Sequence, residues 1–124
     1  MNYKSLRWKK LRESILKRDN YLCQESLRYG KHKAANTVHH IFPAEDYPEY
    51  QWQPWNLISL SNEKHEAMHN RQTNELSDEG LALLYRTARK NNIPAPSRTH
   101  EPKTGGPDGE GFFPLRRGIK LKGT

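Results

Sequence analysis

Four of the six histidines in this 124-residue chain form two tight groups. His39 and His40 are adjacent, and His65 and His69 are four residues apart. Residues four apart on a helix share one face, with Cβ atoms about 5–6 Å apart, so both imidazoles can reach one metal ion. Neighbours on a strand point to opposite faces. One member of the first pair can therefore complete a three-imidazole metal site, and the other is left as a base that titrates near neutral pH.

The residues alone do not assign the two roles within the first pair. Either His39 or His40 can be the ligand, because both orders satisfy the strand geometry. Each group also has an ordinary explanation, since histidines four apart on a helix are often exposed or capping residues. The combination is stronger evidence than either group, because the intervening sequence can fold both around one point. Asn56 is the remaining polar candidate, although asparagine is often a simple turn residue.

The sequence around the histidines predicts the elements that would position them. Residues 37–42 are β-branched and aromatic and stop at a proline, which predicts a strand, and residues 57–60 predict a second short strand. Residues 44–55 contain two prolines and predict a loop held by aromatic side chains. Ser61 or Asn62 can cap a helix that runs through His69. The expected aromatic anchors are Tyr47, Tyr50, Trp52 and Trp55.

Further elements are predicted on either side. The apolar spacing over residues 6–16 predicts an amphipathic helix, and a second helix is predicted from Ser77 to about Asn91. Residues 21–23 predict a short extended piece. From Ile93 onward, five prolines and six glycines in 32 residues predict an irregular segment. We therefore expect one domain over residues 1–91, with its motif core at 37–70, and an irregular basic tail over residues 92–124.

The composition indicates a small basic domain. Apolar residues make up 33% of the chain, against about 45–50% in a typical domain, so the core must be small. A single cysteine excludes an internal disulfide and a tetra-cysteine zinc site. No apolar run approaches the roughly 18 residues of a membrane span, and the first ten residues lack the hydrophobic stretch of a signal peptide. The expected location is the cytoplasm, without membrane association.

The net charge of +7 is unevenly distributed. Residues 1–33 carry +7, residues 34–91 carry −3 and residues 92–124 carry +3. Such asymmetry favours a phosphate-rich partner held by the flanking segments. The alternative is that these lysines and arginines only solvate a helix face, because charge alone is weak evidence for nucleic-acid binding.

Three segments together resemble the motif of the HNH endonucleases. They are Val38-His39-His40-Ile41-Phe42-Pro43, Trp55-Asn56-Leu57-Ile58-Ser59-Leu60 and His65-Glu66-Ala67-Met68-His69. The helix histidines are most similar to the branch that includes the nuclease colicins, and residues 8–12 and 15–24 are similar to the leader of small phage HNH proteins. The resemblance covers about residues 6–70. It implies an α+β fold with a small ββα-metal (HNH, or His-Me finger) core, flanking helices and an irregular C-terminal tail.

The resemblance also implies a reaction and its residues. His39, His65 and His69 would hold one divalent metal, His40 would be the general base, and Asn56 would hold the loop that orients this base. The implied activity is hydrolysis of DNA phosphodiester bonds, with RNA as an alternative substrate. The metal would be Mg²⁺, Mn²⁺, Ni²⁺ or Zn²⁺, and three imidazoles suit the last three better than Mg²⁺, which prefers oxygen ligands.

DNA is the expected partner, and a phage or prophage origin adds proteins of a phage packaging or recombination complex as further partners. Cations in the leader and after the second histidine pair are the predicted phosphate contacts, each with a solvated surface charge as its alternative. These residues are Arg7, Lys10, Arg18, Arg28 and Arg71.

One departure from the family concerns zinc. Many HNH proteins hold a structural zinc with two Cys-x-x-Cys knuckles, but here Cys23 keeps only the first position, and Ser26, Ser61 and Lys64 stand at the others. A thiolate zinc site is therefore excluded, and Cys23 is expected to be an ordinary buried residue. Packing of aromatic residues must replace the zinc, and Phe42 joins the loop aromatics as a candidate.

Two rival functions stay open on the sequence. One is a non-catalytic module that binds nucleic acid or protein on the same scaffold, for which the missing zinc knuckle would be a sign of lost activity. The presence of all four motif histidines with Asn56 argues against it, because binding alone does not need them. The other is a plain helical domain in which the histidines are incidental.

Overall fold

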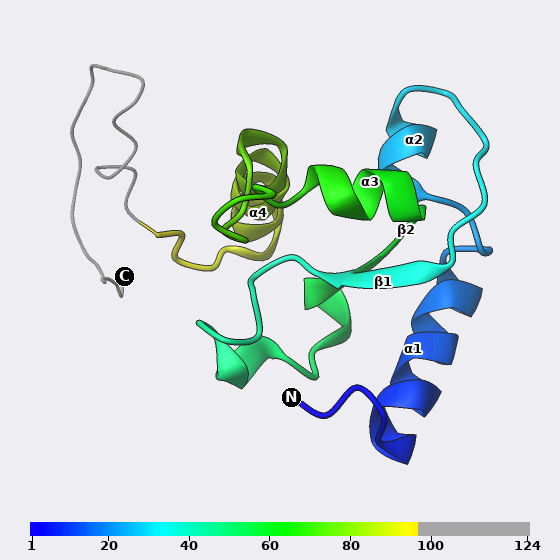
Figure 1. Cartoon of the computed structure of the whole chain (residues 1–124), viewed down its shortest axis with the longest axis horizontal. Helices are drawn as coiled ribbons and strands as arrows, with labels where there is room; N and C mark the ends of the chain where they lie inside the picture. Colours follow the sequence, from blue (N-terminus) through cyan, green and yellow to red (C-terminus); the bar gives the residue numbers. More distant parts are fainter. Residues whose placement is uncertain (97–124) are drawn as a thin grey trace. The chain divides into compact units, whose positions relative to one another are not determined.

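The computed structural model describes residues 1–96. The chain falls into two units, Met1–Thr87 and Ala88–Thr124. The elements, shown in Figure 1, are α1 (Leu6–Arg18), α2 (Gln24–Arg28), β1 (Thr37–His40), the 3-10 turns η1 (Pro48–Tyr50) and η2 (Pro54–Asn56), β2 (Leu57–Leu60), α3 (Asn62–Ala67) and α4 (Asp78–Asn91). The last turn of α4 belongs to the second unit. The predicted irregular tail lies, from residue 97 onward, outside the described residues. Among residues 1–96, no helix is both long and apolar enough to cross a membrane.

The core of the first unit is a short antiparallel hairpin of β1 and β2. Its register runs from Thr37 opposite Leu60 to His40 opposite Leu57. The predicted first strand reached Phe42, but the strand ends two residues earlier. Ile41 and Phe42 donate their backbone N–H groups to the backbone and side-chain oxygens of Asn56, at 2.9 and 2.7 Å. The strand therefore ends because η2 places Asn56 where the next ladder partner would be.

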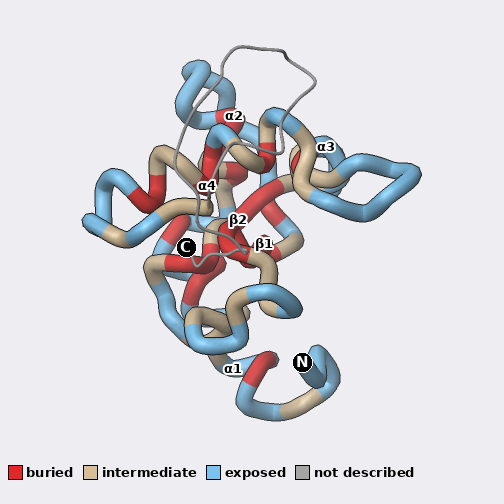
Figure 2. The backbone as a smooth tube through the Cα atoms, turned by 90° about the vertical axis from the view of Figure 1, so that its left-hand side faces the viewer, coloured by how far each residue is buried: buried red, intermediate tan, exposed pale blue. Residues whose placement is uncertain are grey.

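Helices pack against both faces of this hairpin. Val38 joins the hydrophobic cluster that includes Trp8 and Ile15 of α1, whereas the neighbouring His39 contacts His65 of α3. Because successive strand residues point to opposite faces, α1 and α3 lie on opposite sides of the hairpin. Buried residues accordingly concentrate along the strands and on the side of α1 that faces them (Figure 2).

The N-terminal helix confirms the prediction and extends two residues beyond it. Ser5 caps α1, since its hydroxyl accepts from the backbone N–H of Trp8 at 3.1 Å. Asn20 and Tyr21, both with positive φ, then turn the chain. The predicted extended piece is limited to a single bridge between Leu22 and Ala34, and it is followed by α2. The sequence did not predict α2, because a five-residue helix is too short to show an apolar period.

The helix that carries the second histidine pair is shorter than predicted. Ser61 caps α3 as expected, but the helix ends at Ala67 and does not run through His69. Ser77, just before α4, donates its backbone N–H to Met68 at 2.8 Å and its hydroxyl to Ala67 at 2.6 Å. These bonds satisfy the last carbonyls of α3 and turn the chain. His69 consequently lies outside the helix and forms an isolated bridge with Leu76.

The predicted second helix is confirmed as α4. Ser77 caps it by accepting from the backbone N–H of Gly80 at 3.2 Å. A Cβ atom on Gly80 would lie 2.3 Å from the carbonyl oxygen of Met68, so only glycine allows α4 to approach the end of α3 this closely. Two ion pairs also connect α4 to the rest of the first unit: Glu79 pairs with Lys64 of α3 at 3.0 Å, and Arg86 pairs with the buried Glu25 of α2 at 3.0 Å.

Candidate active site

The structure brings His39, His65 and His69 together. Their ring centroids lie 5.2–5.5 Å apart, and one ligating nitrogen from each ring lies within 4.8 Å of the other two. His39 is 1% exposed, and among the described residues its Nε2 atom has no hydrogen-bond partner. A buried nitrogen left unpaired costs about 1–3 kcal/mol, which a metal ion would offset. The donor set therefore fits a divalent cation that accepts imidazole ligands.

The environment keeps His39 and His65 in the neutral form that binds metals. Burial, together with the neighbouring histidines, holds the pKa of His39 well below its ordinary value of 6.5. Burial also lowers the pKa of His65, assisted by the charge of His69. An imidazole must be neutral to donate its lone pair to a metal. The cluster is therefore prepared for a cation at neutral pH.

His40 points to the other face of β1, as the strand alternation predicts. Its ring stacks on Trp8 of α1, with centroids 5.2 Å apart and planes 19° from parallel, and the ring of Tyr3 meets it edge-on at 6.1 Å. Its Nε2 atom lies 3.1 Å from the backbone carbonyl oxygen of Gln51. A carbonyl can only accept, so Nε2 carries the proton, and in the neutral ring Nδ1 is the basic atom.

Burial also lowers the pKa of His40, against the hydrogen bond to Gln51, which raises it. The ring is therefore neutral at pH 7 and able to accept a proton. Although it projects from the opposite face of the strand, the charge of His40 acts on the pKa values of both His39 and His65. His40 is thus adjacent in the chain to His39 of the cluster, and both lie at the end of β1.

Asn56 is completely buried and holds the loop between the strands. Its Oδ1 atom accepts from the N–H of Phe42 at 2.7 Å, and its Nδ2 atom donates to the carbonyls of Phe42 and Tyr50 at 3.1 and 3.2 Å. Tyr50 directly precedes Gln51, whose carbonyl holds the ring of His40. Asn56 thus holds the backbone that orients His40.

Aromatic packing supports the same loop, as the sequence predicts. The ring of Phe42 contacts three loop rings edge-on, with centroids 5.0–5.8 Å apart. Trp52 instead packs against the hydrophobic cluster of α1. The three partners of Phe42 are Tyr47, Tyr50 and Trp55.

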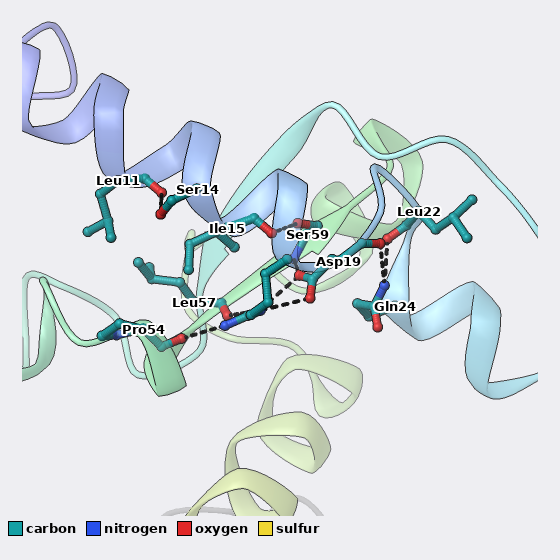
Figure 3. A network of polar contacts seen from close by, with 10 residues as sticks. Leu11, Ser14, Ile15, Asp19, Leu22, Gln24, Pro54, Leu57 and Ser59 are labelled. Atoms are coloured by element: carbon teal, nitrogen blue, oxygen red, sulfur yellow. Dashed lines mark hydrogen bonds and ion pairs between the residues drawn. The ribbon is translucent and has the colours of Figure 1, made fainter.

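Arg18 and Asp19 form a bridge between α1 and the segment around Asn56. Figure 3 shows the network of polar contacts that includes Asp19, Pro54, Leu57 and Ser59. Arg18 makes a two-pronged ion pair with Asp19, at 2.8 and 2.9 Å. Its guanidinium also donates to the carbonyls of Pro54 and Leu57, at 3.0 and 2.8 Å, on either side of Asn56. The Asp19 carboxylate in turn accepts from the backbone N–H of Ser59 in β2 at 3.1 Å. The guanidinium predicted to contact phosphate is thus largely occupied within the chain.

The other predicted phosphate contacts lie on different surfaces. The guanidinium of Arg7 lies 3.9 Å above the ring of Trp52, the residue after Gln51, so Arg7 is on the His40 side. Arg28 lies on α2, where it pairs with Glu25 at 3.2 Å. Lys10 is exposed on α1, and Arg71 is exposed two residues after His69. Arg7 therefore lies on the same side as His40, and Arg71 lies close in the chain to the histidine cluster.

Several residues of the site escaped the sequence reading. Gln51 acts through its backbone carbonyl, which leaves no trace in residue type. Trp8 was expected only as a core residue of α1, and its contact with His40 depends on how α1 packs against the hairpin. Asp19 directly follows α1, and an acid next to an arginine at the end of a helix is the one signal that could have indicated the bridge.

Cys23 is fully buried, as predicted. Burial alone would raise the pKa of its thiol, but hydrogen bonds with Ser26 and Ser61 outweigh this and lower it. The residues at three of the four knuckle positions therefore do lie together in the fold. Hydrogen bonds between the Cys23 thiol and two serines occupy the place of the zinc site that four thiolates form in many HNH proteins.

Comparisons with known proteins agree with this architecture. No family model matches the chain, and no curated protein matches it either. A solved structure does: the HNH endonuclease of the deep-sea thermophilic bacteriophage GVE2, crystallised with a manganese ion, has a TM-score of 0.50 and 36% sequence identity, over 52% of this chain and 70% of that one. This likeness, with the histidine cluster and the ββα arrangement that carries it, shows that the chain belongs to the HNH endonuclease family.

Proposed function

We propose that this protein is a metal-dependent endonuclease that hydrolyses DNA phosphodiester bonds, with His40 as the general base. His39, His65 and His69 would hold the single divalent metal. The observation that carries the proposal is that adjacent histidines of β1 lie in different environments on opposite faces of the strand. The unpartnered Nε2 of His39 lies among three clustered imidazoles, and His40 beside it has one nitrogen held by a carbonyl and the other basic.

In the proposed reaction, Nδ1 of His40 accepts a proton from a water molecule as the water oxygen attacks phosphorus. The bond between phosphorus and the 3′ oxygen breaks as the new P–O bond forms. The Gln51 carbonyl keeps Nε2 protonated throughout and stabilises the imidazolium that results, because a hydrogen bond from a charged donor is the stronger one. General base catalysis by a positioned histidine contributes about 10²- to 10⁴-fold in rate.

The remaining residues hold or orient. Asn56 positions the backbone before Gln51, and Trp8 covers one face of the His40 ring. A divalent cation in the histidine cluster would stabilise the negative charge that develops on the phosphate and on the leaving oxygen. Manganese is a well-founded first choice, because the family member from bacteriophage GVE2 was crystallised with it and Mn²⁺ accepts imidazole ligands.

The test is cleavage of supercoiled plasmid in the presence of Mn²⁺, Mg²⁺, Ni²⁺ or Zn²⁺. We expect His40→Ala to lose cleavage by about 10²-fold or more while its metal uptake, measured by calorimetry, stays unchanged. His65→Ala should lose both metal uptake and cleavage. His100→Ala, the same change in the tail, is the matched control and should behave as wild type.

Four results would contradict the proposal in different ways. Undiminished cleavage by His40→Ala would remove this residue as the base. Undiminished metal uptake by His65→Ala would remove the ligand assignment. No cleavage with any of the four metals, with DNA still retarded in a gel, would indicate the binding module that the sequence left open. Cleavage of RNA but not of plasmid would reassign the substrate.

A further inference from the structure

A basic pocket lies outside the histidine site, between α2 and α3. Its volume is about 320 Å³. Lys31, Lys33 and Lys64 line it together with the carboxylate of Glu63. Ser26 and Tyr29 also belong to the lining. The lining therefore includes three lysines, and lysine is one of the residues that proteins use to bind phosphate oxygens.

Two of the three lysines are available to a ligand. The Nζ atom of Lys64 is paired with Glu79 of α4 at 3.0 Å. Lys31 and Lys33 are exposed and, among the described residues, form no ion pair. Glu63 offsets part of the charge, and the excess of the lining is still positive. Lys31 and Lys33 are thus the residues on which anion binding would depend.

The pocket and the histidine cluster use different sides of the same helix. Lys64 and Ala67, three residues apart, face the pocket, whereas His65 faces His39 and the cluster. Adjacent helix positions differ by about 100° around the axis, so these two faces point in clearly different directions. Figure 1 shows α3 with β1 on one side and α2 on another.

The diameter of α3 limits how far apart the phosphates that contact its two faces can be. A helix with its side chains is about 10–12 Å across. This is close to the width of the DNA major groove, about 12 Å. It exceeds the advance of about 3.4 Å between successive phosphates of one strand along the helix axis. The two faces are therefore spaced to meet two strands of a duplex.

We propose that the pocket binds a backbone phosphate of the DNA strand opposite the one that is cleaved, with α3 lying between the two strands. This inference rests on the proposed function for its assignment of the cleaved strand. Binding at the pocket itself needs no catalysis. Substrate preference follows from the arrangement: duplex DNA engages both faces of α3, and single-stranded DNA engages only the face that bears the histidines.

The experiment compares Lys31→Gln/Lys33→Gln with wild type in binding a fluorescein-labelled 24-base-pair duplex and one of its single strands, in EDTA, over a range of salt. For duplex, the slope of log K against log salt should become shallower by about 0.9, the value for one lost phosphate contact. If the two proteins bind duplex equally at 1 M salt, this change in slope corresponds to about eightfold weaker binding by the glutamine variant at 0.1 M salt. Single-strand binding should not change.

Two further variants control for charge. Arg89→Gln/Lys90→Gln removes the same charge from exposed positions at the end of α4 and should bind duplex as wild type does. Lys31→Arg/Lys33→Arg keeps the charge and should also keep the wild-type slope. An unchanged duplex slope in the glutamine variant would overturn the proposal, as would equal losses for duplex and single strand. Because no cleavage is measured, a failure of the nuclease proposal would leave this result readable.

Discussion

Arg18 shows how the use of a side chain can differ from what its charge suggests. The sequence places it among the phosphate contacts, because it belongs to a basic leader. In the structure its guanidinium donates hydrogen bonds to the carboxylate of Asp19 and to the carbonyls on either side of Asn56. A planar guanidinium can serve these acceptors together, and an ammonium group cannot. Arg18 is therefore a positioning residue for the loop that orients His40.

Arg18→Lys tests this role because it keeps the positive charge and removes the planar guanidinium with its several N–H donors. We expect the variant to be less stable by about 1 kcal/mol, since partly buried acceptors lose hydrogen bonds. In the nuclease assay, kcat should fall about 10- to 100-fold through misplacement of the base, while KM and the salt dependence of DNA binding stay unchanged. Arg71→Gln, at an exposed site, should leave kcat unchanged, raise KM and make the salt dependence of DNA binding shallower. A wild-type kcat with a weakened salt dependence would identify Arg18 as a phosphate contact instead.

His39 makes the stability of the metal-free protein depend on pH. Its pKa is held well below 6.5 in the folded protein, so the unfolded chain takes up a proton near pH 6.5 while the folded protein does not. The unfolded state then binds more protons, and stability falls as the pH drops below about 6.5. Each such group contributes a slope of up to about 1.4 kcal/mol per pH unit.

Urea unfolding in EDTA between pH 7.5 and 5 measures this slope. We expect the free energy of unfolding to decrease steadily below pH 6.5, and to decrease less in His39→Gln, which has no proton to gain. The same variant of the exposed His32 should retain the wild-type slope. Stability that rose on acidification would show that the imidazole of His39 is not held neutral by the fold.

The junction between α3 and α4 determines where the third histidine lies. Because α3 ends at Ala67, His69 is held by its bridge with Leu76 and by the approach of α4 to Met68. An α-helical continuation would have placed His69 one turn after His65 on a regular helix face. The histidine cluster is therefore formed by three elements, the strand, the helix and the turn that follows it.

Gly80→Ala separates helix propensity from packing at this junction. Propensity alone predicts that alanine stabilises α4 by about 1 kcal/mol. A Cβ 2.3 Å from the Met68 oxygen must instead displace α4, and we expect a loss of about 1–3 kcal/mol together with weaker Mn²⁺ binding. Thermal unfolding and a calorimetric metal titration measure the two effects. Ala82→Gly, at an exposed position of the same helix, should lower stability without changing metal affinity.

At the scale of the whole molecule, we expect metal binding at the histidine cluster to raise stability. A ligand that binds only the folded state stabilises it by RT ln(1 + [L]/Kd), which is about 2.7 kcal/mol at a hundred times Kd. With a small core and no disulfide, such a contribution is a large part of the stability of a domain this size.

Titration with Mn²⁺ followed by thermal unfolding tests the coupling. The melting temperature of the wild type should rise with metal concentration, and EDTA should reverse the rise. His65→Ala should show no such dependence, whereas His40→Ala should show all of it, because His40 is not among the three clustered ligands. Equal stabilisation of both variants would place the metal elsewhere.

Much of this protein is readable from local sequence. The helices over residues 6–16 and from Ser77, the two strands and the alternation of His39 and His40 follow from apolar periodicity and strand geometry, which depend on neighbouring residues alone. The spacing of His65 and His69 and the caps at Ser61 and Ser77 are equally local. These features sufficed to predict the histidine cluster and to indicate the family.

Tertiary packing decided the rest. Whether His39 or His40 meets His65 depends on which face of β1 is covered by α3, and the hydrogen bond to His40 comes from a backbone carbonyl that no residue type reveals. The hydrogen bonds of Arg18 span 36 and 39 residues, and α3 ends where α4 supplies Ser77. Such contacts arise only when distant segments pack, so a pattern confined to neighbouring residues cannot contain them.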